Sequence, residues 1–166
     1  MTLHSCNRIV LRVLLLTALA VSSMSAQSVP KPLKTRLVVG DPIWRELPVW
    51  LEIQGNYEKV WQTMLNTLLE HNYEIATMEK ASGYLRTTPN KSVVILKDNW
   101  FYTVQISVKL VTSPTDATKV EKIRLQVLGD VTNTDKVGRL KSSFRGYDQI
   151  VLQTLFQDLQ AKLGAV

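Results

Sequence analysis

A strict alternation of apolar and polar side chains from Trp100 to Val111 constrains the fold more than any other feature of this chain. This period of two is typical of a β-strand, because successive side chains of a strand point to opposite faces. An alternating strand of this length indicates an antiparallel sheet with one buried face and one wetter face. The side chains expected on the buried face are those of Trp100, Tyr102, Val104, Ile106, Val108 and Leu110.

Further strands are predicted before and after this one. Residues 119–128 are expected to return as its partner, with Ile123, Leu125 and Val127 facing the core. Residues 129–145 are polar and contain glycine, so they are expected to form a loop that is long by the usual standard. Shorter strands, with a turn at 80–83, are expected at residues 35–39, 49–53, 73–78, 84–88 and 92–96.

Two helices are predicted from apolar side chains that recur at intervals of three and four residues. The first runs from about 57 to 71 and begins after the N-cap residue Asn56. It is expected to end at Asn72, because asparagine readily adopts the left-handed backbone conformation that ends helices. The second runs from about 146 to 163 and ends before Gly164. The order strand, helix, several antiparallel strands, helix predicts an α+β fold in a single domain at 35–166.

The first 26 residues have the pattern of a signal peptide. Arg8 and Arg12 supply the positive region, Val13 to Val21 is an apolar run, and small residues precede a cleavage site after Ala26 or Ser25. The alternative is a transmembrane anchor, but a span needs roughly 20 apolar residues. The sequence therefore predicts export to the periplasm, followed by a linker at 27–34 with two prolines.

Cysteine and charge restrict the remaining classes of function. The single cysteine, Cys6, lies before the apolar run, so a lipoprotein is not expected and the mature chain is expected to lack disulfides and thiolate metal sites. Loss of Arg8 and Arg12 lowers the 20 basic residues to 18 against 14 acidic ones, a mature net charge of about +4. This mild excess permits attraction to anionic lipid or lipopolysaccharide, whereas nucleic acid is not an expected partner of an exported protein.

A search for reactive groups predicts no catalytic, cofactor-binding or metal-binding residues. The mature chain has one histidine, His71, which is expected at a helix end and has no motif of a nucleophilic serine near it. Carboxylates are scattered singly, and the glycines lack the spacing of a phosphate-binding loop. The chain is therefore expected not to be an enzyme. The enzyme alternative would need a polar constellation in a cleft, around His71 for example.

Two groups of residues are candidates for binding. Basic residues in and near the predicted loop would form a surface for anionic partners, unless they belong to a solvated loop and strand edge. They are Lys136, Arg139, Lys141 and Arg145, with Lys122, Arg124 and Lys119 from the neighbouring strand. An apolar groove between the sheet and the second helix would be lined by Trp100, Tyr102, Val104 and Phe156. Trp44 or Trp50 is a further candidate, as an exposed anchor for a partner.

The segment from Leu47 to Thr88 contains a strand, a turn, a helix with an early tryptophan, an Asn-Tyr-Glu-Ile-Ala strand and a Lys-Ala-Ser-Gly-Tyr-Leu-Arg-Thr hairpin. It resembles the helix-grip domains of BamC-like proteins, accessory lipoproteins of the outer-membrane β-barrel assembly machinery. The resemblance implies a helix-grip-like fold, with a curved antiparallel sheet and two helices, and no functional site. This chain differs in lacking a lipidation cysteine and in having room for one such domain. The matching positions are Trp61, Leu68, Tyr73, Ile75, Gly83, Leu85 and Thr87.

These features favour an exported, non-catalytic binding or scaffold protein, an accessory in envelope or outer-membrane protein assembly. Its expected partners are envelope proteins, outer-membrane assembly factors among them, with a contact to lipid or lipopolysaccharide as a further possibility. The alternative is a periplasmic carrier of a lipid or other apolar ligand in a helix-grip pocket. A pocket smaller than roughly 300 Å³ would argue against a carrier of sizeable ligands.

Cleavage of the predicted signal peptide can be tested by the intact mass of the protein recovered from the periplasm. The chain is expected to begin at Ala26 or Gln27, because small residues at this point suit a signal peptidase. A variant with Leu14→Asp and Leu15→Asp, which interrupts the apolar run, is expected to keep the segment. A wild-type mass that still includes residues 1–26 would contradict the prediction.

Overall fold

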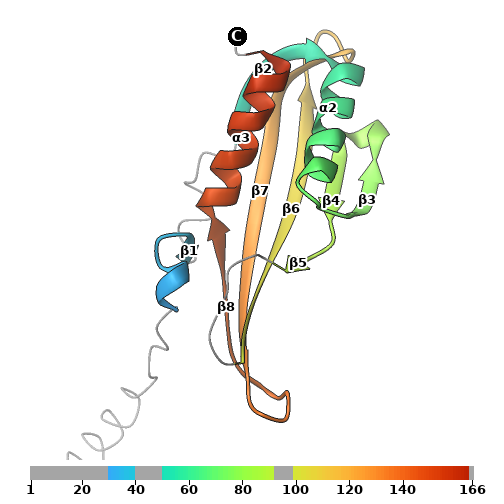
Figure 1. The fold of residues 1–166 in the computed structure, drawn as a ribbon. Helices are drawn as coiled ribbons and strands as arrows, with labels where there is room; N and C mark the ends of the chain where they lie inside the picture. Colours follow the sequence, from blue (N-terminus) through green and yellow to red (C-terminus); the bar gives the residue numbers. More distant parts are fainter. Residues whose placement is uncertain (1–29, 40–49, 92–98, 165–166) are drawn as a thin grey trace, which may run out of the picture.

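The computed structural model describes residues 30–39, 50–91 and 99–164, which form an α+β fold built on one antiparallel sheet. The order of its main strands is β1-β8-β7-β6-β4-β3; β2 also pairs with β7, and β5 with β6 (Figure 1). The predicted strand at 92–96 and Trp44 lie outside the described residues, as does the predicted signal peptide. The strands are β1 (Leu37–Val39), β2 (Trp50–Asn56), β3 (Ile75–Glu79), β4 (Tyr84–Thr87), β5 (Asn90–Lys91), β6 (Trp100–Thr112), β7 (Lys119–Thr134) and β8 (Leu140–Asp148).

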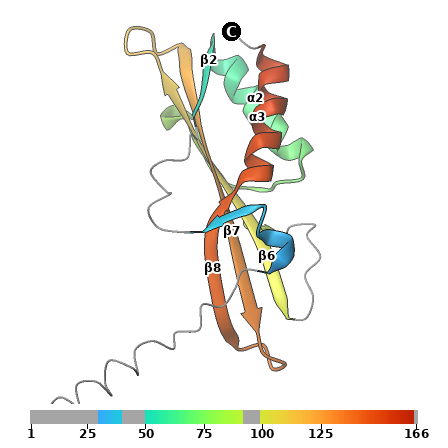
Figure 2. The same ribbon diagram turned by 90° about the vertical axis from the view of Figure 1, so that its left-hand side faces the viewer.

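The long ribbon of β6, β7 and β8 is the centre of the sheet. The alternation that predicted β6 is confirmed, since the side chains from Tyr102 to Leu110 that were expected to face the core are at most 4% exposed. β6 pairs with β7 from Trp100↔Asn133 to Thr112↔Val120. Figure 2 shows that these strands twist along their length, and a right-handed twist is the normal geometry of β-strands.

The two helices cover the same face of the sheet, at the end where β6 turns into β7 (Figures 1 and 2). The helix α2 (Tyr57–Glu70) begins as predicted at Asn56, whose side chain accepts hydrogen bonds from the amides of Glu58 and Lys59. Asn72, just beyond its end, has the predicted left-handed backbone, with φ of 60°. The side chains that α2 buries are those of Val60, Trp61, Met64, Thr67 and Leu68.

The prediction of a long loop at residues 129–145 is wrong, because most of this segment belongs to two strands. β7 continues to Thr134, and β8 begins at Leu140, so only a tight turn remains between them. The segment looks like a loop in sequence because most of its side chains are polar, but Val131 is fully buried and Phe144 packs against the core. Between them, Thr132 and Ser143 face each other across the β7–β8 ladder and lie on the opposite, wetter face.

Three other element boundaries differ from their predicted positions. The strand predicted to stop at Gly55 runs through it to Asn56, and the helix predicted from 146 begins at Gln149 as α3 (Gln149–Leu163). The predicted linker contains a short 3₁₀ helix, η1 (Lys31–Leu33), and the Leu33 side chain is 0% exposed. The folded part therefore begins before residue 35, because Leu33 fills part of the core.

A buried carboxylate joins the N-terminal segment to α3. Asp148 is 0% exposed, and its Oδ2 accepts hydrogen bonds from Arg36 Nε and Tyr102 Oη, both at 2.6 Å. Its Oδ1 accepts the Val151 amide at 3.0 Å and so caps α3. Burial works against the charged guanidinium, yet the bond to Asp148 raises the pKa of Arg36 above its ordinary value. Burial also raises the pKa of Tyr102, so its hydroxyl stays protonated as a donor to Asp148.

Gly129 provides the space for this arrangement. A Cβ at that position would lie 2.5 Å from the hydroxyl oxygen of Tyr102 and 2.6 Å from Cδ1 of Leu37. Real Cβ atoms essentially never show contacts this short, so a side chain at this position would force the Tyr102 and Leu37 side chains to shift. The absence of a side chain at this position of β7 therefore lets the side chains of Tyr102 and Leu37 lie directly against the β7 backbone.

Replacement of Asp148 by alanine is expected to lower the free energy of unfolding by about 3–5 kcal/mol, because it leaves Arg36 and Tyr102 without their shared partner. The matched control is Asp130→Ala, which removes the carboxylate of a more exposed pair with Arg145. That change is expected to cost about 0.2–1 kcal/mol. Urea unfolding of the two variants measures both values, and equal losses would contradict the structural role assigned to Asp148.

Candidate functional site

The basic residues predicted as one surface lie in separate groups along the β7–β8 hairpin. Lys122 and Arg124 are near the start of β7, beside β2. Lys136, Arg139 and Lys141 are at the opposite end, in and just after the turn that joins β7 to β8. From Lys122 to Thr134 the strand advances about 40 Å at roughly 3.3 Å per residue. The prediction of a single basic surface that includes residues of both ends is therefore wrong.

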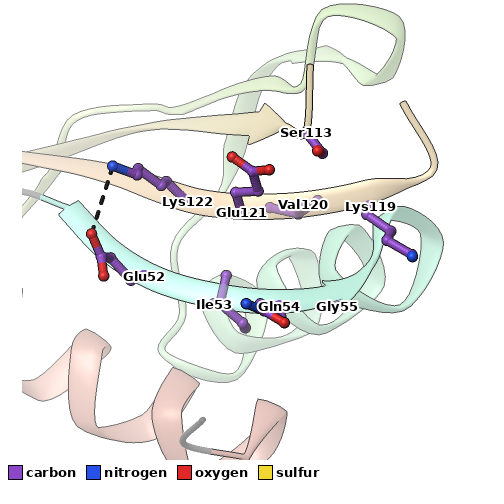
Figure 3. A pocket seen from close by; sticks show the side chains of 9 residues that line it. All are labelled: Glu52, Ile53, Gln54, Gly55, Ser113, Lys119, Val120, Glu121 and Lys122. Atoms are coloured by element: carbon purple, nitrogen blue, oxygen red, sulfur yellow. Dashed lines mark ion pairs between the residues drawn. The ribbon is translucent and has the colours of Figure 1, made fainter. Parts of the chain in front are cut away.

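The group beside β2 is balanced by acidic neighbours. Lys122 Nζ lies 3.6 Å from Glu52 Oε1, and Lys119 Nζ lies 3.5 Å from Asp116 Oδ2. Figure 3 shows the open groove of about 510 Å³ to which these lysines contribute, between β2 and β7. Glu52 and Glu121 line the same groove. Because both signs of charge are present, this groove is not a specific site for an anion.

Arg145 is also paired within the protein. Its Nε donates to Asp130 Oδ1 at 2.7 Å, and its Nη2 donates to Oδ2 at 3.2 Å, across the β7–β8 ladder. The hydrogen bond with Asp130 raises the pKa of Arg145. This bidentate cross-strand pair makes a structural contribution to the sheet, and an anionic partner would have to compete with it.

The end of the hairpin carries exposed cations together with exposed apolar side chains. We call residues 136–141, with the sequence Lys-Val-Gly-Arg-Leu-Lys, the hairpin tip. All six residues are exposed, and Val137 and Leu140 are 76% and 65% exposed. Within the described ranges, no ion pair involves the side chains of Lys136, Arg139 or Lys141. Among the described residues, the charges of the tip therefore have no ion-pair partner.

The backbone of the turn is held by Asp135. Its Oδ1 accepts hydrogen bonds from the amides of Val137 at 2.9 Å and Arg139 at 2.8 Å. The Asp135 amide donates to the carbonyl of Arg139, and the Gly138 amide donates to the carbonyl of Asp135. Gly138 adopts a left-handed φ of 82°, which a residue without Cβ accommodates without strain. These four bonds satisfy six backbone polar groups of the turn and fix its shape.

Aromatic side chains lie on both faces of the ribbon just above the tip. Trp100 and Phe144 stack with ring centroids 6.1 Å apart on the inner face. Phe101 lies on the other face and is 49% exposed. Trp100 is opposite Asn133, close to the last pair of the hairpin, Thr134↔Leu140. The end of the ribbon thus combines cationic, aliphatic and aromatic side chains.

The four residues predicted to line an apolar groove do not gather around one cavity. Tyr102 and Val104 are 4% and 2% exposed and belong to the core. Trp100 stacks on Phe144, and Phe156 is a half-buried neighbour of the core on α3. An open cleft of about 490 Å³ lies beside the start of α3, but of the four predicted residues only Val104 contributes to it. The space between sheet and helices is filled by side chains at the predicted groove positions.

His71 lies at that cleft and belongs to a network between the helices. Its Nε2 is 3.1 Å from Asp158 Oδ2, and Lys162 Nζ lies 3.0 Å from the same oxygen and also contacts Glu70. These contacts link the end of α2 to α3, which is a structural task. In the part of the chain that the structure describes, no group of three histidine, cysteine or acidic residues is arranged to hold a metal ion.

No family model matches this chain, and no curated protein matches it significantly. None of the helices described in the structure is long and apolar enough to cross a membrane. The candidate site is therefore defined by geometry, and we assign it to the hairpin tip with the aromatic side chains above it.

Val137 and Leu140 were missed as candidate binding residues in the sequence. Residues 129–145 were interpreted as a loop, so only the cations were singled out, and apolar side chains between them had no expected position. The available signal was the interleaving of cationic and apolar residues around Gly138. In a tight turn this pattern places both kinds of side chain on one exposed end.

The His71 network is expected to contribute to stability at neutral pH. The hydrogen bond from Lys162 and that from His71 lower the pKa of Asp158 below its ordinary 3.8. A carboxylate with a lowered pKa stabilises the fold above its unfolded-state pKa, and this contribution is lost as the pH falls through the folded-state pKa. Lys162→Gln is therefore expected to lower the Tm slightly at pH 7, and the difference from wild type is expected to shrink as the pH falls below 3.8 through the lowered folded-state pKa of Asp158. A Tm difference that persists unchanged at pH 3 would contradict this assignment.

Proposed function

We propose that this chain is an exported, non-catalytic binding or scaffold protein, an accessory in envelope or outer-membrane protein assembly, that contacts an anionic partner through the hairpin tip. The observation that supports the proposal is the placement, at the end of the ribbon, of two exposed apolar residues and three cations that form no ion pair with any described residue. A charged group without an internal partner is free to meet an opposite charge on another molecule.

The shape of the molecule favours a role in contact formation. The ribbon of β6, β7 and β8 extends well beyond α2 and α3, and the tip is at its far end (Figure 1). The tip is thus accessible to a large partner that could not approach a recessed site. Its turn is fixed by four internal hydrogen bonds, so little conformational entropy is lost when it binds.

The assembly role rests on the predicted signal peptide and on the resemblance of residues 47–88 to BamC-like helix-grip domains. An α+β sheet with two helices on one face is compatible with that resemblance, although many unrelated functions share such folds. The alternative of a carrier has less support, because Tyr102 and Val104 are core residues rather than walls of a ligand pocket. Envelope proteins remain the expected partners in assembly.

The proposal can be tested by photo-crosslinking in cells. A benzophenone amino acid at Val137 is expected to crosslink to an envelope component, because this side chain is exposed at the tip. The matched control is the same amino acid at Ala117, in the exposed turn at the other end of the ribbon. A crosslink that forms at residue 137 and weakens when Lys136, Arg139 and Lys141 are changed to glutamine would support the function.

The result against the proposal is equally specific. Equal crosslinking from residues 117 and 137, or none from residue 137 in intact envelopes, would show that the tip is not the contact surface.

A further inference from the structure

We infer that the hairpin tip binds the phosphate-bearing surface of an anionic lipid bilayer, with Val137 and Leu140 entering the headgroup region. This inference rests on the proposed function and names the partner of the same site. Its physical basis is the combination of charge, apolar exposure and backbone hydrogen bonding at one narrow end of the ribbon.

The charge of the tip suits a surface of lipid phosphates. Lys136, Arg139 and Lys141 contribute three positive charges, and the neighbouring Asp135 contributes one negative charge, which leaves a net charge of +2. The Asp135 carboxylate is occupied by backbone amides of the turn, so it faces the chain itself. Cationic segments of this kind are attracted to anionic lipid within about one Debye length of the membrane.

The apolar side chains provide the second part of the contact. Val137 and Leu140 are the two most exposed large hydrophobic residues in the described part of the chain. Lysine and arginine beside such residues can extend their charged ends to the phosphates while their alkyl parts remain near the apolar layer. Trp100 and Phe101, one on each face of the ribbon, lie where the interface would follow the tip, and aromatic side chains favour that region.

Internal hydrogen bonds lower the cost of bringing the turn close to a medium of low polarity. The amides of Val137, Gly138 and Arg139 and the carbonyls of Asp135 and Arg139 all have hydrogen-bond partners inside the turn. An unpaired amide or carbonyl would oppose entry into the headgroup region. The hydrogen bonds centred on Asp135 thus suit the tip to shallow insertion.

The small size of the tip favours lipid over a protein partner. A specific protein interface buries about 800 Å² on each partner, which six residues at the end of a hairpin do not supply. A bilayer offers phosphate groups at every position, so a few cations and two apolar side chains suffice for a reversible contact. We therefore assign the tip to the lipid surface and leave any protein partner to other parts of the molecule.

The test uses flotation of the full chain, as recovered from cells, with vesicles of phosphatidylcholine alone or mixed equally with phosphatidylglycerol. The protein is expected to bind the mixed vesicles and to bind the neutral ones far more weakly. Changing Lys136, Arg139 and Lys141 to glutamine is expected to weaken binding by on the order of 100-fold. Val137→Ser with Leu140→Ser, which keeps the charge, is expected to weaken it by on the order of 10-fold.

The matched control changes three exposed lysines away from the tip, Lys31, Lys34 and Lys59, to glutamine. It lowers the net charge by the same amount, and a loss of less than about 3-fold is expected. Circular dichroism and the Tm of each variant check that the fold is kept. If the control and the tip variant lose binding equally, the attraction is due to net charge, and the inference is overturned.

The remaining outcomes decide the lipid inference, and the first of them separates it from the proposed function. A protein that ignores anionic vesicles but crosslinks through residue 137 to an envelope protein would overturn the lipid inference and leave the proposed function standing. Binding to anionic vesicles that is unchanged in both tip variants would overturn it as well, since another segment would then be responsible. Binding that depends on the tip cations and on Val137 and Leu140 would establish it.

Discussion

The buried Asp148 carboxylate is the interaction on which the arrangement of this protein depends. Three hydrogen bonds connect it to Arg36, to Tyr102 on β6 and to the first turn of α3. It therefore joins the N-terminal segment, the central strand and the second helix at one point. A charge buried this completely is tolerated only when its oxygens are paired, so the three partners must be in place together.

This junction divides the inner face of the ribbon into two parts. Beyond it, α2 and α3 cover the half of the sheet near the β6–β7 turn (Figures 1 and 2). Before it, Leu33 and Leu37 of the N-terminal segment add buried side chains to the core. The hairpin tip lies past both coverings, which is why its apolar side chains remain in contact with water. The proposed binding function follows from this incomplete cover of a long ribbon.

The parts of the candidate site differed in how well they could be predicted. Lys136, Arg139 and Lys141 could be named from the sequence, because charged residues are conspicuous without any fold. Their separation from Lys122 and Arg124 could not, since it depends on β7 continuing as one strand to Thr134. The polar stretch after Leu128 has too few apolar residues to indicate a strand, and its backbone is held by pairing with β6 and β8. The prediction that Tyr102 and Val104 line an apolar groove was not met for a related reason. Alternation identifies buried positions, but it does not distinguish a residue packed in the core from one that lines a cavity.

The sequence alone determined the α+β class, the strand β6 and the helix α2 with its Asn56 cap, because local periodicity and capping are encoded within about fifteen residues. Only the tertiary structure decided that Leu33 belongs to the core, that Asp148 meets Arg36 across 112 positions of the chain, and that the tip is left uncovered. These features arise from contacts between segments that are distant in sequence. No local pattern specifies such contacts, since the partner of each residue is fixed by the sheet register and by the packing of the elements around it.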